Sequence, residues 1–243
     1  MAAFEDIKKV GVIGAGTMGR GIVMNFVNAG YPVTWLDVNG EMLEKGKVEI
    51  AAVYKRSVAQ ERFDDAEAQA RLNRISTTQE YADLADLDLV VEAVYENMDL
   101  KKKIFTELDK AVKPSAILAT NTSYLDIDEI ASATQRPTQV LGLHFFSPAH
   151  IMKLLEVVRG KATAQDVMDA CLAVGKKIGK EAVLAGNCHR LNGNRMLEKY
   201  SRQSREVVLE GSTPWEVDQA LQGFGMAMGP YRMYDVLGVD LGW

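Results

Sequence analysis

Cysteine, histidine and proline are scarce in this chain, which has 2, 3 and 6 of them among 243 residues. The two cysteines, Cys171 and Cys188, lie far apart, and neither belongs to a C-x-x-C pair or to a Cys/His cluster. This spacing argues against a zinc site. Two isolated thiols are typical of a reducing compartment, so we expect a cytoplasmic protein.

The chain also lacks an excess of basic residues and any long apolar run. Its 28 Lys and Arg residues are outnumbered by 33 Asp and Glu residues, and the net charge is −5. Nucleic acid is therefore not an expected partner. No apolar stretch approaches the length of a membrane span, and Glu5 and Asp6 interrupt the first ten residues, so we expect neither membrane insertion nor a secretory signal.

What the chain does contain is an alternation of short apolar runs and helical patterns. The expected strands cover residues 8–13, 32–38, 88–94, 116–120, 139–146, 154–158 and 181–185. The expected helices cover 17–29, 99–112, 126–133, 164–178, 194–210 and 215–221, with two more as a helical insertion within 41–74. This pattern predicts an α/β Rossmann-type domain over 1–186, with a doubly wound, mainly parallel sheet. A smaller all-α domain over 187–243, which looks truncated, is expected to follow.

A glycine-rich loop follows the first expected strand. Gly14, Gly16 and Gly19 fit the pattern G-x-G-x-x-G, and the loop opens a helix, which is the context that a dinucleotide-binding loop requires. We expect Met18, inside the loop, to join the glycines in binding the cofactor. Asp37 ends the second strand, where a carboxylate accepts hydrogen bonds from a ribose 2′-hydroxyl and repels a 2′-phosphate. The expected cofactor is therefore NAD.

Two ionisable residues lie inside apolar strands, where a charge is costly unless it is paired. His144 lies near the end of the strand 139–146, and Glu156 lies within 154–158. If these strands are neighbours, Glu156 is a natural partner for His144, and a histidine oriented by a carboxylate is a competent base near neutral pH. Together with the glycine loop, the pair predicts an enzyme that oxidises an alcohol with a nicotinamide cofactor. Taken alone, a histidine in this position is more readily interpreted as a satisfied core residue.

The sequence resembles the L-3-hydroxyacyl-CoA dehydrogenases, including the dehydrogenase part of two-function fatty-acid oxidation proteins. The matching stretches are GVIGAGTMGRGI at 11–22, VVEAVYENMDLKKKIF at 90–105, ATNTSYL at 119–125, GLHFFSPAHIMKLLEVVRG at 142–160, GNRM at 193–196 and FGMAMGPYRMYDVLGVDLGW at 224–243. The resemblance implies NAD-dependent oxidation of (3S)-3-hydroxyacyl-CoA to 3-oxoacyl-CoA in fatty-acid beta-oxidation.

The resemblance also implies roles for single residues. It makes His144 the general base with Glu156 as its partner, and it has Ser123 contact the nicotinamide side and the substrate oxygen. It has Asn194 bind the reacting acyl-CoA. It places two further residues along the bound NAD, namely Glu96 and Lys101. Without the resemblance, Ser123 is an ordinary turn or cap residue, Asn194 is a helix cap, and the other two belong to a solvated face.

Three features depart from the family pattern. Ser147 stands where the family usually has asparagine. Arg190 and Asn192 replace a glycine and an apolar residue in the segment that leads to Asn194, and both changes are expected to disturb how Asn194 is presented. Family members usually continue with further helices, so we expect this chain to be a fragment of a longer protein.

Other interpretations of the function remain open at this point. One is a dehydrogenase of a free hydroxy acid on the same fold, and another is an NAD-binding module without turnover. An acyl-CoA substrate would favour cationic contacts to its phosphates, which Lys55 and Arg56 in the helical insertion would supply. The expected assembly is a homodimer or a place in a longer multifunctional chain.

Overall fold

The computed structural model describes residues 4–188 and 191–237. Contacts between Cα atoms divide the chain into two compact units, residues 1–191 and 192–243. Each unit is described by itself below. Within the described part of the chain, no helix is both long enough and apolar enough to cross a membrane.

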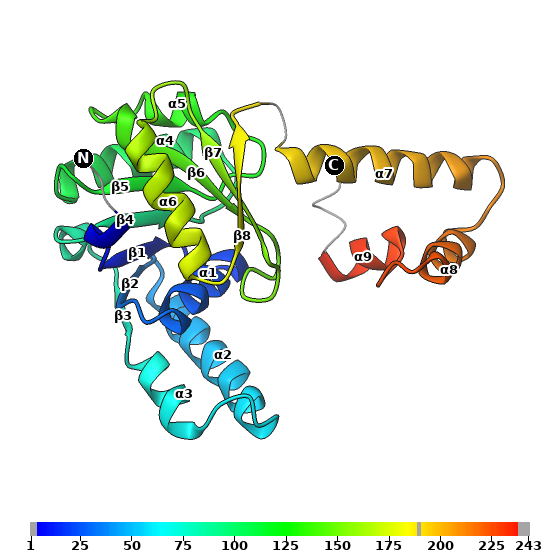
Figure 1. The fold of residues 1–243 in the computed structure, drawn as a ribbon, viewed down its shortest axis with the longest axis horizontal. Coiled ribbons are helices and arrows are strands. Elements are labelled where there is room, and N and C mark those ends of the chain that lie inside the picture. Colours follow the sequence, from blue (N-terminus) through cyan, green and yellow to red (C-terminus); the bar gives the residue numbers. More distant parts are fainter. Residues whose placement is uncertain (1–3, 189–190, 238–243) are drawn as a thin grey trace. The chain divides into compact units, whose positions relative to one another are not determined.

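The first unit is built on one sheet with the strand order β3-β2-β1-β4-β5-β6-β7-β8 (Figure 1). Its strands are β1 (Val10–Ile13), β2 (Val33–Leu36), β3 (Ile75–Thr78), β4 (Leu89–Glu92), β5 (Ile117–Thr120), β6 (Val140–Phe145), β7 (Leu154–Arg159) and β8 (Glu181–Gly186). Neighbouring strands from β3 to β6 are parallel, β7 is antiparallel to β6, and β8 is parallel to β7. The order 3-2-1-4-5-6 is that of a dinucleotide-binding sheet.

Helices cover both faces of this sheet. They are α1 (Thr17–Asn28), α2 (Gly40–Ala59), α3 (Asp65–Leu72), α4 (Met98–Ala111), α5 (Ile127–Ala131) and α6 (Gln165–Lys177). Two separate apolar cores result, one shared by α1, α2, α3 and α6 and the other by α4 and α5. Side chains alternate between these cores along the central strands, as in Leu89 and Val91 against Val90 on β4. This double burial explains why the central strands are continuous apolar runs.

The predicted fold class is confirmed, and each of the seven expected strands is present. The sequence pattern missed β3, because Ile75–Thr78 is a short edge strand with three hydroxyl side chains and no alternation of apolar residues. The two helices expected within 41–74 are α2 and α3. Their loop carries Asp64, whose side chain accepts a hydrogen bond from the Glu67 N–H and so caps α3.

The second unit contains α7 (Asn192–Leu209), α8 (Pro214–Phe224) and α9 (Pro230–Leu237), the last of which the sequence pattern did not indicate. Thr213 and Glu216 form a capping box at the start of α8. The Asp218 carboxylate of α8 accepts hydrogen bonds from the backbone N–H groups of Tyr231 and Arg232, at 3.0 Å each. Polar contacts of this kind connect the helices of the unit.

Candidate active site

The glycine loop lies between β1 and α1, and two of its glycines are required by their surroundings. Gly14 has φ +103°, and a Cβ there would lie 2.7 Å from the carbonyl oxygen of Ala93. A Cβ on Gly19 would lie 1.9 Å from the carbonyl oxygen of Gly14. The first glycine therefore permits the turn beside β4, and the third brings α1 into contact with the loop.

The middle glycine has a different environment. A Cβ on Gly16 would meet no atom within 4 Å, so open space lies above its backbone. Gly16 is also the N-cap of α1, and no side chain caps the N–H groups of the first turn. Free N–H groups at a helix N-terminus bind phosphate. An open approach to Gly16 and uncapped amides fit the pyrophosphate of a dinucleotide.

Asp37 follows β2 and reaches the same loop. Its Oδ2 accepts a hydrogen bond from the Ala15 N–H at 2.6 Å, and its Oδ1 accepts one from the Asn39 N–H at 2.9 Å. The carboxylate is thus held beside the glycine loop, where a ribose would follow the pyrophosphate. This position agrees with the expected recognition of NAD.

His144 and Glu156 face each other as paired residues of β6 and β7. The His144 Nδ1 lies 2.8 Å from Oε2 of Glu156, and the two residues are 3% and 0% exposed. The predicted partnership is therefore present. Since an ionised carboxylate only accepts hydrogen bonds, Nδ1 carries the proton in this contact, and Nε2 is left as the basic nitrogen of the neutral ring.

The loop between β6 and β7 sets this pairing, and a buried lysine anchors it. Lys180 donates hydrogen bonds from Nζ to the carbonyl oxygens of Ala149 and Met152, at 2.6 and 2.7 Å. The Asn25 side chain of α1 donates to the same Ala149 oxygen at 2.9 Å. Burial lowers the pKa of Lys180 to about 8. The loop is thereby attached both to the helix that follows the glycine loop and to the turn before β8.

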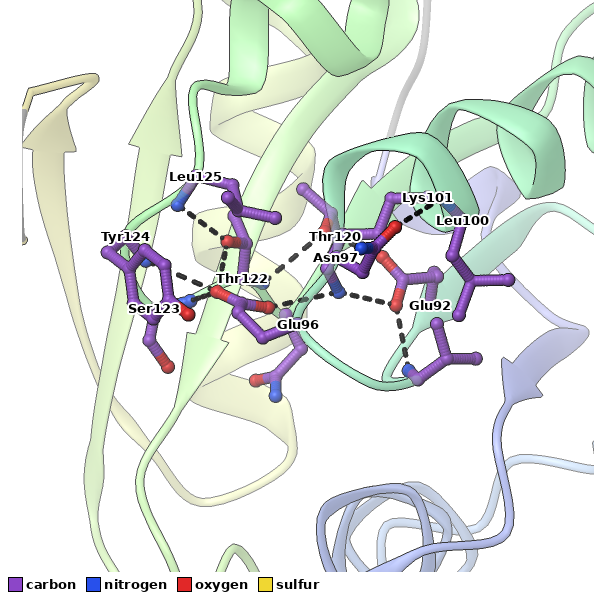
Figure 2. A network of polar contacts seen from close by, with 12 residues as sticks. Glu92, Glu96, Asn97, Leu100, Lys101, Thr120, Thr122, Ser123, Tyr124 and Leu125 are labelled. Atoms are coloured by element: carbon purple, nitrogen blue, oxygen red, sulfur yellow. Dashed lines mark hydrogen bonds and ion pairs between the residues drawn. The ribbon is translucent and has the colours of Figure 1, made fainter. Parts of the chain in front are cut away.

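Ser123 lies in the turn after β5, and Glu96 holds the backbone of this turn. The Glu96 Oε1 accepts hydrogen bonds from the N–H of Ser123 at 2.6 Å, from the N–H of Tyr124 at 3.3 Å and from the Thr122 hydroxyl. The other oxygen of Glu96 lies 3.2 Å from Nζ of Lys101. The three residues that the resemblance assigned to the cofactor side are therefore joined in one network (Figure 2).

The network includes a residue that the sequence analysis did not select. Glu92, the last residue of β4, lies 2.7 Å from Nζ of Lys101, and the two side chains are 0% and 1% exposed. Lys101 is thus buried between two carboxylates, and its interpretation as part of a solvated face is wrong. Glu92 had the same sequence signal as Glu156, a carboxylate inside an apolar strand.

Asn121 joins this network to the strand that carries His144. Its side-chain oxygen accepts a hydrogen bond from the Phe145 N–H at 2.8 Å, and its own N–H donates to the Glu92 carbonyl oxygen at 2.7 Å. Strands β1, β2, β4, β5 and β6 are parallel, so their carboxyl ends share one edge of the sheet. The glycine loop, Asp37, the Ser123 turn and His144 all lie at this edge, where open α/β sheets bind ligands.

The remaining predicted residues belong to other segments of the chain. Asn194 belongs to α7 in the second unit, and Ser147 follows β6 and is half-buried. Arg190 lies outside the described residues. Asn192 is exposed, and its side-chain oxygen accepts a hydrogen bond from Arg195 at 2.7 Å. The family pattern has an apolar residue at this position, but Asn192 instead makes an exposed polar contact.

Two family models match the chain. One, described as "3-hydroxyacyl-CoA dehydrogenase, NAD binding domain", matches residues 9–188. The other, described as "3-hydroxyacyl-CoA dehydrogenase, C-terminal domain", matches residues 192–243. The first alone covers well over half of the chain and contains the glycine loop, the Ser123 turn and the His144–Glu156 pair.

Two relatives with similar sequences are much longer than this chain. It is 44% identical over 243 residues to a peroxisomal bifunctional enzyme of Cavia porcellus, covering all of this chain and 33% of the relative. It is 40% identical to a peroxisomal fatty acid beta-oxidation multifunctional protein of Arabidopsis thaliana, covering 96% of this chain and 32% of the relative. The chain thus spans about a third of these relatives.

A solved structure also shares the fold. The (S)-3-hydroxybutyryl-CoA dehydrogenase of Ralstonia eutropha is 34% identical and superimposes with a TM-score of 0.92. The superposition covers 97% of this chain and 84% of that one.

Proposed function

Because the chain belongs to the 3-hydroxyacyl-CoA dehydrogenase family, we propose that it oxidises (3S)-3-hydroxyacyl-CoA to 3-oxoacyl-CoA with NAD. The observation that supports this most is the buried His144–Glu156 pair, at the same sheet edge as the glycine loop. Such a pair supplies a base for the hydroxyl proton, and the glycine loop supplies a site for the cofactor.

In the proposed reaction, His144 takes the substrate's hydroxyl proton at Nε2. Glu156 holds the ring through Nδ1 and stabilises the imidazolium that forms, because its negative charge lies 2.8 Å away. Bound NAD would accept the hydride that leaves the carbon bearing this hydroxyl group. Ser123 would contact the substrate oxygen, and Asn194 would bind the acyl-CoA. Gly14, Gly16, Met18, Gly19 and Asp37 would hold the cofactor, together with Glu96 and Lys101.

An acyl-CoA substrate is proposed over a free hydroxy acid on two grounds. The Ralstonia eutropha structure is named for a CoA thioester substrate. Lys55 and Arg56 are exposed on α2, where two cations are able to meet CoA phosphates. We assign residues 1–186 to NAD binding and 187–243 to substrate binding or dimer contacts.

The decisive experiment follows NADH consumption with acetoacetyl-CoA, and separately with free acetoacetate. We expect turnover with the thioester and at most a trace with the free acid. The reverse preference would favour a free hydroxy-acid dehydrogenase, and NAD binding without turnover on either compound would favour a non-catalytic module. The His144→Gln variant is the matched control for contaminating activity.

The cellular setting is also a proposal. The relatives are named bifunctional or multifunctional proteins, so we propose that this chain acts in beta-oxidation, either as a homodimer or within a longer multifunctional chain. Scarce cysteine favours the cytoplasm, whereas these relatives are named peroxisomal. Fractionation of cells that express the natural full-length protein distinguishes the two compartments.

A further inference from the structure

Glu92 is a fully buried carboxylate with no direct place in the proposed reaction. Both of its oxygens are engaged. Oε1 accepts hydrogen bonds from the Val94 N–H and from Nζ of Lys101, at 2.7 Å each, and Oε2 accepts one from the Thr120 hydroxyl at 2.7 Å. A carboxylate that is 0% exposed is costly unless it is paired and hydrogen-bonded throughout. These three donors satisfy both oxygens of the buried group.

The contacts of Glu92 lead in two steps to the Ser123 turn. Lys101 joins Glu92 to Glu96, with its Nζ 2.7 Å from the first carboxylate and 3.2 Å from the second. Glu96 then accepts hydrogen bonds from the N–H groups of Ser123 and Tyr124. Figure 2 shows these side chains in one row from the end of β4 to the turn after β5.

The charges along this row explain why Glu92 matters. One ammonium lies between two carboxylates, and the shorter contact is to Glu92. If Glu92 were neutral, Glu96 would become the sole anionic partner in this row. Lys101 would then attract Glu96 more strongly, and Glu96 is the carboxylate that accepts the hydrogen bond from the Ser123 N–H. In a buried polar network, the loss of one charge changes the position of its partners, because each group is held by its hydrogen bonds to the next.

We propose that Glu92 is a positioning residue for the reaction: its carboxylate fixes Lys101 and Thr120, and through Lys101 it keeps Glu96 against the Ser123 turn. The proposal rests on the proposed function, because it assumes that Ser123 acts on the substrate. It assigns to Glu92 no contact with substrate or cofactor.

A second ion pair on the same strand provides a matched control. Asp88 directly precedes β4 and pairs with Lys113, at the opposite end of the strand from the site. Its other oxygen accepts hydrogen bonds from the N–H groups of Lys8 and Lys9. Asp88→Asn and Glu92→Gln therefore each remove the negative charge of a carboxylate that pairs with a lysine, but only Glu92 is connected to the Ser123 turn.

The kinetic test is a double-mutant cycle of Glu92→Gln with Ser123→Ala, with acetoacetyl-CoA as substrate. We expect Glu92→Gln to lower kcat roughly tenfold and to change the KM for NAD less than about threefold, because misplacement of a positioned group mainly affects turnover. In the Ser123→Ala background the same change should alter kcat less than about twofold. Asp88→Asn should leave kcat unchanged.

A merely structural role gives a different result. Loss of folded protein would lower kcat by the same factor in both backgrounds, and that outcome would overturn the proposal. If Glu92→Gln does not fold, Thr120→Val replaces it. This variant removes the hydroxyl that donates to Oε2 and that accepts a longer hydrogen bond, 3.3 Å, from the Thr122 N–H, while leaving the Lys101 pair. We expect a smaller loss of kcat that again disappears with Ser123→Ala.

Amide hydrogen exchange tests the inference without any turnover. The N–H groups of Ser123 and Tyr124 should exchange about tenfold faster in Glu92→Gln than in the wild type, because their acceptor on Glu96 is displaced. They should be unchanged in Asp88→Asn. Unchanged exchange in Glu92→Gln would overturn the positioning role. If the wild type shows no turnover, the proposed function fails while this measurement still decides the role of Glu92.

Discussion

His144 and Glu156 are paired in the antiparallel ladder of β6 and β7, and their side chains meet at 2.8 Å on the sheet face covered by α4 and α5. The face follows from alternation, because Leu143 and Phe145 on β6, and Leu155 and Val157 on β7, belong to the opposite core. The orientation of the proposed catalytic pair is therefore fixed by the sheet itself.

His144→Gln should leave NAD affinity nearly intact, because the glycine loop and Asp37 follow other strands, β1 and β2. It should lower turnover roughly 10²- to 10⁴-fold, the usual contribution of a positioned acid–base group. Stopped-flow NADH absorbance and calorimetric NAD binding measure the two effects. Combining it with Glu156→Gln should add little further loss, since the two residues act as a unit. Near-normal turnover in a folded, NAD-binding His144→Gln sample would refute the mechanism.

Two alanine substitutions in the glycine loop should have opposite consequences. Gly19→Ala places a Cβ 1.9 Å from a backbone oxygen of Gly14, so it should lower the melting temperature strongly. Gly16→Ala meets no protein atom within 4 Å and should fold normally, yet weaken NAD binding about tenfold or more because the Cβ occupies the phosphate approach. Differential scanning fluorimetry with and without NAD separates the cases. Normal NAD affinity in Gly16→Ala would place the pyrophosphate elsewhere.

Asp37 should make the protein prefer NAD strongly over NADP. Asp37→Ser should narrow that preference, chiefly through weaker NAD binding, because the carboxylate also holds the Ala15 and Asn39 N–H groups. Titration of both cofactors by protein fluorescence gives the ratio. Equal affinity of the wild type for the two cofactors would contradict the assignment of Asp37 to the ribose.

Acid should weaken the fold through Asp88. Burial acts to raise the pKa of Asp88, but hydrogen bonds from Lys113 and from the backbone N–H groups of Lys8 and Lys9 hold it below its ordinary value. A carboxyl whose pKa is lowered by folding stabilises the protein above about pH 4, and this contribution disappears as pH falls through the folded-state pKa. Urea unfolding should therefore show wild type more stable than Asp88→Asn at pH 7, with the difference shrinking below pH 4. A constant difference would exclude this ionisation as the cause.

Much of the site follows from local sequence patterns. The glycine loop was evident because it stands between a strand and a helix, and His144 and Glu156 were evident because ionisable residues in apolar strands require partners. The antiparallel direction of β7 was not evident, since a short apolar run has the same pattern in either direction. The strand β3 was missed because an edge strand needs no apolar alternation.

Lys101 and Glu92 show what such patterns do not contain. Lys101 lies in a run of three lysines, which is typical of a solvated helix face, yet it is 1% exposed. Its burial depends on where α4 packs against β4, and that contact joins residues from separate elements. The burial of Glu92 was predictable, because a carboxylate that follows Val90 and Val91 in an apolar strand needs a charged or polar partner, as Glu156 does.

The chain distance between paired strands bears on the order in which the site assembles during folding. His144 and Glu156 are 12 residues apart and close a short hairpin. The cofactor edge instead requires β1 to pair with β4, which brings Val10 beside Leu89 and encloses the whole helical insertion. Because closing a longer loop costs more chain entropy, contacts close in sequence form earlier. We therefore expect His144 and Glu156 to come together before β1 pairs with β4 at the proposed cofactor edge.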